Sequence, residues 1–383
     1  MGRMQLFTEN TITTVLPFLA EPSHRVAARV ARLWTIVFGA NVIGAFLAAA
    51  FYLIPDVLSA DLLGAMIHVS EHAVSLDPMT AFLRGIPAGV LIAALVWMLP
   101  RGGSSKLALI VLFTWLIAAS DLTHVVAGSV EVALLIIGGN LSVPAGFGGF
   151  ILPVLLGNIL GGTAIFTALA WGQVHQEAIL HLHLPDTPAR FVFENFGYCL
   201  GFVVVIMGRM QLFTENTITT VLPFLAEPSH RVAARVARLW TIVFGANVIG
   251  AFLAAAFYLI PDVLSADLLG AMIHVSEHAV SLDPMTAFLR GIPAGVLIAA
   301  LVWMLPRGGS SKLALIVLFT WLIAASDLTH VVAGSVEVAL LIIGGNLSVP
   351  AGFGGFILPV LLGNILGGTA IFTALAWGQV HQE

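Results

Sequence analysis

Long apolar runs separated by short polar stretches make up most of this chain. A run of about 20 apolar residues can cross the ~30 Å hydrocarbon core of a bilayer as a helix. Within the first 177 residues, such runs lie at 30–54, 80–99, 107–138 and 151–171. The run 107–138 is too long for one plain span, and polar residues interrupt it near DLTHVVAGS. The pattern predicts an all-α polytopic transmembrane bundle, with a surface helix in the more polar residues 56–79.

Composition strengthens this interpretation. Charged residues make up 9% of the chain and hydrophobic residues 59%, whereas charged residues make up about 25% of an average soluble protein. The net charge of −5 excludes a basic nucleic-acid binder. The single cysteine, Cys199, allows no intrachain disulfide and no CxxC metal site, and we expect it to pack inertly. Because no nucleotide-binding motif is present, we expect neither ATP-driven transport nor an enzyme, and no cofactor.

The chain contains an internal repeat. Residues 1–177 recur without substitution at 207–383, so that only residues 178–206 are unique. A further apolar run, 191–210, leads directly into the second copy and has no counterpart before the first, which we therefore expect to begin within a helix. Internal repeats in transporters are normally diverged. Perfect identity indicates a very recent duplication, engineering or an assembly error.

Basic residues predict the orientation of each copy. Arg25, Arg29 and Arg32 precede the first full span, and Arg101 and Lys106 occupy a later loop. Both loops should be cytoplasmic by the positive-inside rule. Five apolar runs separate the arginine loop of one copy from that of the other, and an odd number places the two loops on opposite sides. The sequence therefore predicts a frustrated chain, with one span excluded or the first copy poorly folded.

Three motifs, LFTENTITTV, DLTHVVAGS and LLGNILGG, occur in this order, and together they resemble the formate/nitrite transporter family. The resemblance implies a pentamer in the bacterial inner membrane, with six helices and one pore for each protomer. It further implies that the second and fifth helices are broken at the midplane, where small monovalent anions, and protons as a second partner, cross the lipid bilayer. Residues 178–206 then supply the tail of a first helix and the start of the second. The near-complete unit is 178–383, formed with the copy 207–383, and 1–177 is a truncated copy.

His330, with its copy His124, lies in the predicted break of the fifth helix. A histidine at this depth can donate a hydrogen bond or a proton to a weak acid. The alternative is a buried histidine satisfied by its packing partners. Asp327 precedes His330 by three residues, and on a helical turn it would share a face with the imidazole and orient it. The family often has an acidic residue at the position of Thr329.

Thr214, with its copy Thr8, lies in the predicted break of the second helix. Such a break exposes backbone N–H groups that attract anions, and a hydroxyl there can hold an anion opposite the histidine. The alternative is a threonine that bonds its own helix carbonyl. By resemblance, Leu212 and Phe213 form the cytoplasmic constriction. Tyr198 and Phe202, four residues apart, are candidates for the outer constriction, with ordinary apolar packing as the alternative.

Several other polar residues have weaker assignments. Arg209 and Glu215 could pair within the span, and the family commonly has an asparagine at the position of Gly295. His68 and His72 are one turn apart, but without a third ligand a solvated amphipathic helix is the better interpretation than a metal site. We expect transport of a small monovalent anion, and the sequence does not identify which one. A small neutral-solute pore and a non-functional tandem fusion are the alternatives.

Overall fold

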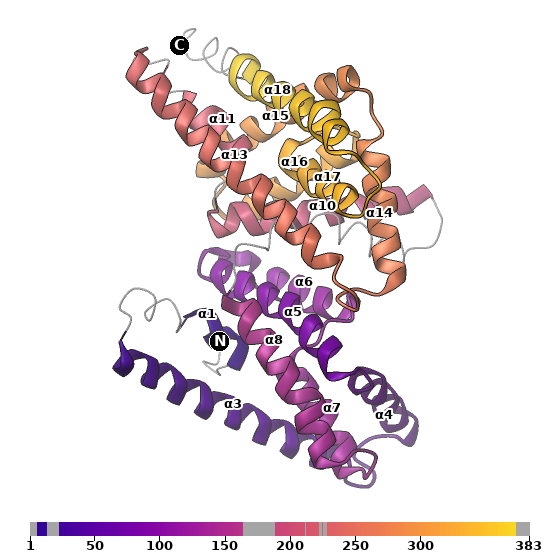
Figure 1. Cartoon of the computed structure of the whole chain (residues 1–383). Helices are drawn as coiled ribbons and strands as arrows, with labels where there is room; N and C mark the ends of the chain where they lie inside the picture. The colour runs from indigo at the N-terminus through magenta and orange to yellow at the C-terminus, as the bar shows by residue number, and fades with distance from the viewer. Residues whose placement is uncertain are drawn as a thin grey trace. The chain divides into compact units, whose positions relative to one another are not determined.

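The computed structural model describes residues 6–13, 23–163, 188–210, 212–221, 224 and 228–372, and all regular elements within them are helical. The chain forms two compact units (Figure 1). Unit 1 comprises Met1–Pro100 and Lys106–Ile165, and unit 2 comprises Arg101–Ser105 and Phe166–Glu383. Each unit contains one copy of the repeat, and the helices of the two copies correspond closely.

Unit 1 contains seven α-helices in the part that the structure describes, with a π-helix η3 (Ala145–Ile151) leading into the last. They are α1 (Phe7–Thr13), α3 (His24–Tyr52), α4 (Ala60–Val74), α5 (Pro78–Met98), α6 (Lys106–Ala119), α7 (Val125–Ile137) and α8 (Leu152–Thr163). Short 3-10 turns, η1 (Leu99–Arg101) and η2 (Gly103–Ser105), connect α5 to α6.

Unit 2 has the same succession, preceded by the additional helix α10 (Pro188–Gly208). Its helices are α11 (Phe213–Thr219), α13 (His230–Tyr258), α14 (Ala266–Val280), α15 (Pro284–Met304), α16 (Lys312–Ala325), α17 (Val331–Ile343) and α18 (Leu358–Ile365). The 3-10 turns η5 (Leu305–Arg307) and η6 (Gly309–Ser311) join α15 to α16, and the π-helices η7 (Ala351–Ile357) and η8 (Leu366–Ile371) flank α18.

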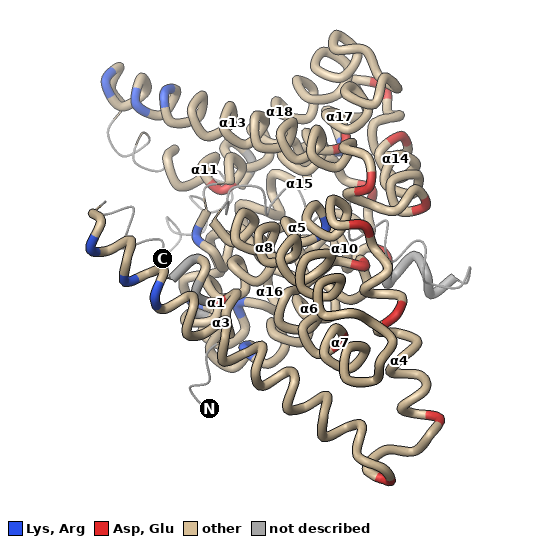
Figure 2. Tube along the Cα trace, turned by 60° about the horizontal axis from the view of Figure 1, so that its bottom comes forward, with Lys and Arg blue, Asp and Glu red and all other residues tan. Residues whose placement is uncertain are grey.

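The predicted spans are present. Among the described residues, six helices are long and apolar enough to cross a membrane, and the bent pair Glu194–Gly208 and Phe213–Thr219 is a seventh candidate. The predicted surface helix corresponds to α4 and α14. In unit 2 the basic residues that begin α13 and the acidic residues of α14 lie at opposite ends (Figure 2), which agrees with the orientation predicted from charge within one copy.

Both predicted helix breaks are confirmed. The axis turns by 55° between α10 and α11, where Arg209 has a φ of 55°. The second break separates α16 from α17, and there Asp327 has a φ of 47°. Each left-handed residue ends the preceding helix because it cannot continue the right-handed backbone. Inside a bilayer, the backbone groups that such breaks release must find partners within the protein.

Asn364 supplies those partners at the second break. Its side-chain amide donates to the carbonyl oxygens of Gly291 at 2.8 Å and Thr329 at 2.9 Å, and its Oδ1 accepts from the N–H of Val331 at 2.8 Å. One buried side chain on α18 therefore ties α15 to both sides of the break. Glycines allow this approach: a Cβ at Gly367 would overlap the carbonyl oxygen of Ile292 on α15.

Candidate functional site

The two helix breaks of unit 2 meet at a pair of polar side chains. Thr214 Oγ1, in the first turn of α11, lies 2.7 Å from Nε2 of His330, which precedes α17. Both side chains are almost fully buried, with 1% and 2% of their surfaces exposed. The structure therefore brings together the two residues that the sequence placed in separate breaks, 116 positions apart.

His330 is also the N-cap of α17. Its Nδ1 accepts a long hydrogen bond of 3.4 Å from the N–H of Ala333. Because Nδ1 accepts, the tautomer that satisfies both contacts has its hydrogen on Nε2 and donates to Thr214 Oγ1. The Thr214 hydroxyl then retains its own hydrogen for donation to a solute. The positive end of the α17 dipole lies at the same place and favours negative charge.

The break is anchored to α15 from the other side as well. Thr329 donates its hydroxyl hydrogen to the carbonyl oxygen of Ala287 at 2.7 Å, and its N–H donates to the carbonyl oxygen of Arg290 at 3.4 Å. Thr329 is thus committed to a structural contact at the position where the family often carries an acid. Together with Asn364, these bonds fix where the imidazole of His330 sits.

Helix α10 covers the histidine. The ring of Phe202 meets the imidazole edge-on at a centroid distance of 5.0 Å, and Tyr198 lies 5.3 Å from Phe202, centroid to centroid. The predicted shared face of these two aromatic residues is therefore confirmed, and their role as a constriction stays a prediction. Cys199 is buried between α10 and α16, with Sγ 3.5 Å from the carbonyl oxygen of Val317.

Leu212 and Phe213 are buried below the pair. The Phe213 ring packs edge-on against Trp240 at 5.7 Å and Phe244 at 5.3 Å, between ring centroids, and its N–H donates to Oδ1 of Asn247 at 3.0 Å. These contacts hold the start of α11 against α13. The cytoplasmic constriction assigned to Leu212 and Phe213 stays a prediction, since neither residue lines the cavity described below.

The orienting role suggested for Asp327 is wrong. The turn before His330 is not helical, because α16 ends at Ala325 and α17 begins at Val331. Asp327 is exposed, and its backbone carbonyl accepts from Arg290 Nη1 at 3.3 Å. Its side chain instead lines the cavity above the histidine.

The structure also differs from the expectations for the Arg209–Glu215 pair and for Gly295. Arg209 and Glu215, both described, form no ion pair with each other, and one carboxyl oxygen of Glu215 is buried without a hydrogen-bond partner. Gly295 does not face the cavity. It lies against α18, where a Cβ would overlap the backbone of Asn364, so the family's asparagine has no room there.

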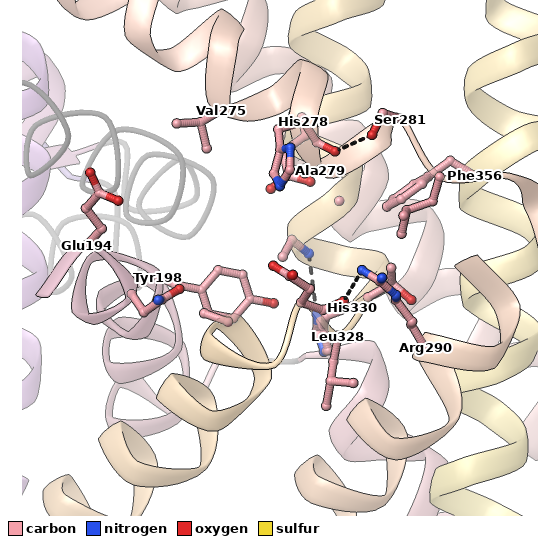
Figure 3. A pocket seen from close by; sticks show the side chains of 18 of the residues that line it. Glu194, Tyr198, Val275, His278, Ala279, Ser281, Arg290, Leu328, His330 and Phe356 are labelled. Atoms are coloured by element: carbon pink, nitrogen blue, oxygen red, sulfur yellow. Dashed lines mark hydrogen bonds between the residues drawn. The ribbon is translucent and has the colours of Figure 1, made fainter. Parts of the chain in front are cut away.

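A cavity of about 480 Å³ opens above His330 (Figure 3). Its polar lining comes from four helices of unit 2, the end of α14 and the break between α16 and α17: Glu194, Asn195 and Tyr198 on α10, His274 and His278 on α14, Ser281 after α14, Arg290 on α15, Asp327, Thr329 and His330 in the break, and Glu337 on α17. Figure 3 shows Tyr198 and His330 facing this space. It is a polar vestibule that reaches His330, and His330 in turn contacts Thr214, which does not itself line the cavity.

The sequence marks Glu337 as an ionisable residue within a span, which usually faces protein or water and not lipid, but it does not assign Glu337 to the path. Glu337 follows His330 by seven positions, the spacing of one helix face, and that period was the available signal. Other lining residues were missed. Arg290 was visible as a charge within an apolar helix. His274 and His278 belong to a helix that was expected to face only solvent. Among the described residues, no group of three or more His, Cys, Asp or Glu side chains is placed to hold a metal ion.

Unit 1 repeats the pair without its cover. Thr8 Oγ1 lies 2.9 Å from Nε2 of His124, and a cavity of about 370 Å³ lies beside it. Arg84 Nη1 and His72 Nε2 lie 3.7 Å and 3.8 Å from Oδ2 of Asp121. His124 is only partly buried, unlike His330.

Apolar spans, two broken helices and a polar pair at their meeting point define a multi-pass membrane transport protein. The family model of formate/nitrite transporters matches residues 1–172 and again residues 174–378. The chain belongs to this family, whose members are transport proteins of the membrane and not enzymes. As a relative of an inner membrane protein with several spans, it is a multi-pass protein of the inner membrane.

Relatives of known name support this placement. The chain is 39% identical over 222 residues to inner membrane protein YfdC of Escherichia coli, an alignment that covers 58% of the chain and 72% of YfdC. It is 24% identical over 196 residues to the formate channel FocA of Haemophilus influenzae, covering 45% of the chain and 68% of FocA.

Two solved structures are similar to about half of the chain. A pentameric formate channel with formate bound aligns with a TM-score of 0.46 and 20% identity, over 57% of this chain and 97% of the channel. An FNT family ion channel aligns with a TM-score of 0.47 and 23% identity, over 56% of this chain and 88% of that protein.

Proposed function

We propose that the protein carries small monovalent anions of the formate/nitrite type through unit 2. The observation that supports this most directly is the Thr214–His330 pair, whose histidine lines a polar cavity. With the imidazole hydrogen on Nε2, the threonine hydroxyl is left to donate to an anion. Family membership supplies the substrate class, and the geometry supplies the donors.

The working unit in this proposal is 178–383. Helix α10 is part of unit 2 and buries His330 under Phe202, whereas His124 in unit 1 is only partly buried. A conducting path needs an apolar cover on the histidine. Water beside the imidazole would stabilise its charged form and would let hydrated ions leak through the path. We further propose that the unit assembles as a homopentamer, as the family resemblance implies.

A neutral-solute pore is the second candidate, and the composition of the cavity favours it. Glu194, Asp327 and Glu337 line the space together with a single guanidinium, that of Arg290. Ionised carboxyls repel an approaching anion, whereas a neutral solute is indifferent to their charge. A non-transporting tandem fusion is the remaining alternative.

Solute flux into liposomes that contain the full chain separates these functions. Formate and nitrite uptake is measured beside uptake of urea and glycerol, at mildly acidic and at neutral external pH, with protein-free liposomes as the baseline. We expect anion uptake above the baseline and no protein-dependent urea or glycerol uptake. Rapid urea or glycerol uptake without anion uptake establishes the neutral pore, and no uptake of any solute establishes the inert fusion.

A further inference from the structure

We propose that Glu337 is the proton-donating site at which unit 2 takes up small weak acids, with monocarboxylates as the substrate class. The inference rests on the proposed anion transport and adds a residue and a chemical step to it. Glu337 lies on α17 in the wall of the cavity, above the threonine–histidine pair.

The position of this carboxyl is unusual. Only 6% of the Glu337 surface is exposed, and its side chain forms no hydrogen bond or ion pair with any other described residue. It nevertheless lines the cavity. A polar group that is more than nine-tenths buried normally has a protein partner. The side of the Glu337 carboxyl that protein does not cover therefore faces the cavity. A hydrogen-bond partner for this carboxyl must come from the cavity.

The face of α17 that carries Glu337 leads to His330. His330, Ala333, Gly334 and Glu337 all line the cavity, at the spacing of three, four and seven residues that marks one side of a helix. Seven residues correspond to about 10 Å along the axis. The two residues between the ionisable groups are the smallest available, so no side chain of this helix blocks the way from one to the other.

The charged and titratable groups around Glu337 come from every neighbouring element. Helix α10 contributes Glu194 and Tyr198, α14 contributes His274 and His278, α15 contributes Arg290, and the break contributes Asp327 and His330. Helix α13 carries no charged residue after Arg238, and its only later titratable group is Tyr258. Residues 351–371 carry none. With all carboxyls ionised, the cavity holds three negative charges against one permanent positive charge.

Only the protonated form of Glu337 suits an anion. Two like charges close together in a cavity that water screens poorly repel each other. The neutral carboxylic acid removes that repulsion and adds one O–H donor, which the anion accepts. Donation to an anionic oxygen makes a short, strong hydrogen bond, along which the proton can move.

The step is a single proton transfer. The O–H bond of the Glu337 carboxyl breaks and an O–H bond forms on the incoming carboxylate, so that a neutral acid and the Glu337 carboxylate result. The neutral acid passes under Phe202 toward Thr214. External water, reached past the exposed His274 and His278, returns one proton to Glu337 for each acid taken up.

The test uses the full chain in liposomes with a trapped pH dye, and formate as the probe. Because Glu131 repeats Glu337 in the first copy, both are changed in E131Q/E337Q. Wild-type protein should acidify the lumen during formate uptake, at a rate that rises as the external pH falls. The glutamine pair should lose both the acidification and the pH dependence, and its remaining uptake should follow the membrane potential, because formate then crosses as an ion.

Two further variants complete the design. E71Q/E277Q removes exposed carboxyls that accept from Asn140 and Asn346 at 3.0 Å outside the cavities, and it should behave as wild type. E131D/E337D keeps a carboxyl and should keep the acidification. If the glutamine pair does not reach the membrane, the aspartate pair decides: formate uptake without acidification overturns the inference.

The remaining outcomes are distinct. Acidification and pH dependence that persist in E131Q/E337Q overturn the role of Glu337 and leave the anion transport standing. If E71Q/E277Q loses the acidification and the pH dependence to the same extent, the loss is a general effect of removing negative charge. That result also overturns the role of Glu337. Absence of formate uptake in the wild-type protein overturns the proposed function, and this inference with it.

Discussion

The hydroxyl oxygen of Thr214 lies 2.7 Å from the imidazole Nε2 of His330, and each residue stands in a break of a different helix. The contact joins two pieces of chain that are far apart in sequence, and its histidine lines the cavity. Every group that holds it in place is a backbone amide, an asparagine or a threonine, so the pair is positioned without a charged partner on either side chain.

Replacing the histidine should reduce anion flux strongly. His330→Asn, made together with His124→Asn so that the first copy cannot mask the loss, keeps hydrogen-bonding capacity but cannot carry a proton. Formate uptake into liposomes and its dependence on pH provide the measurement. The matched control is His24→Asn with His230→Asn, since these histidines begin α3 and α13 outside both cavities. Wild-type uptake and pH dependence in the His330 variant would contradict its role.

Removing the threonine hydroxyl should weaken anion binding more than stability. Thr214→Val, with Thr8→Val in the first copy, keeps the branched shape and deletes one donor to a charged solute. Such a hydrogen bond contributes about 1.5–3 kcal/mol. The concentration of formate that gives half-maximal uptake should rise accordingly, while the thermal unfolding temperature changes little. An unchanged half-saturating concentration argues against the assignment.

Close packing of α15 on η8, and of α5 on α8, predicts a sharp cost for one methyl group. Gly367→Ala, with Gly161→Ala in the first copy, places a Cβ onto the carbonyl oxygen of Ile292 and of Ile86 respectively. Overpacking of this kind costs about 1–3 kcal/mol, and more where backbone must move. Gly44→Ala with Gly250→Ala is the control, because nothing lies within 4 Å of either added Cβ. Equal thermal unfolding temperatures for the two pairs would show that the helices separate easily.

The N-cap of α15 should make its first turn sensitive to acid. The Thr286 hydroxyl and the N–H groups of Thr286 and Met285 donate to Asp283, and these bonds lower its pKa below the ordinary value of 3.8. A lowered folded-state pKa means that the cap stabilises above that ordinary value and is lost as pH falls through the folded-state pKa. Hydrogen exchange in residues 284–288 should therefore be faster in D77A/D283A than in wild type near neutral pH. The difference should vanish in strong acid, and a difference that is independent of pH would refute the charge-based account.

Charge patterning predicts that the full chain is frustrated in a bilayer. The identical arginine-rich first turns of α3 and α13 both favour the cytoplasm, yet five apolar runs separate them. Single cysteines at Ala28→Cys and Ala234→Cys, in a Cys199→Ser background, report the side of each helix start by labelling from outside. We expect labelling to show a mixture of orientations or an excluded span. A stable, homogeneous protein with the two sites on opposite sides and every run inserted would disprove the frustration.

The sequence alone determined the features that depend on local composition and on the spacing of apolar residues along the chain. Apolar runs near 20 residues identified the spans, and the polar residues in DLTHVVAGS and LFTEN identified both breaks, because a bilayer tolerates polar backbone only where the helix is interrupted. It also nominated Thr214 and His330 separately. Tertiary structure decided their 2.7 Å contact, the cover of Phe202 on the imidazole, and the surroundings of Glu337 and Arg290. It also took Asp327 off the helical face of His330, because Asp327 has a left-handed backbone that no helical periodicity anticipates. These outcomes depend on which helix faces pack together, and Asn364 and the glycines of α18 set that packing through contacts between residues distant in the chain.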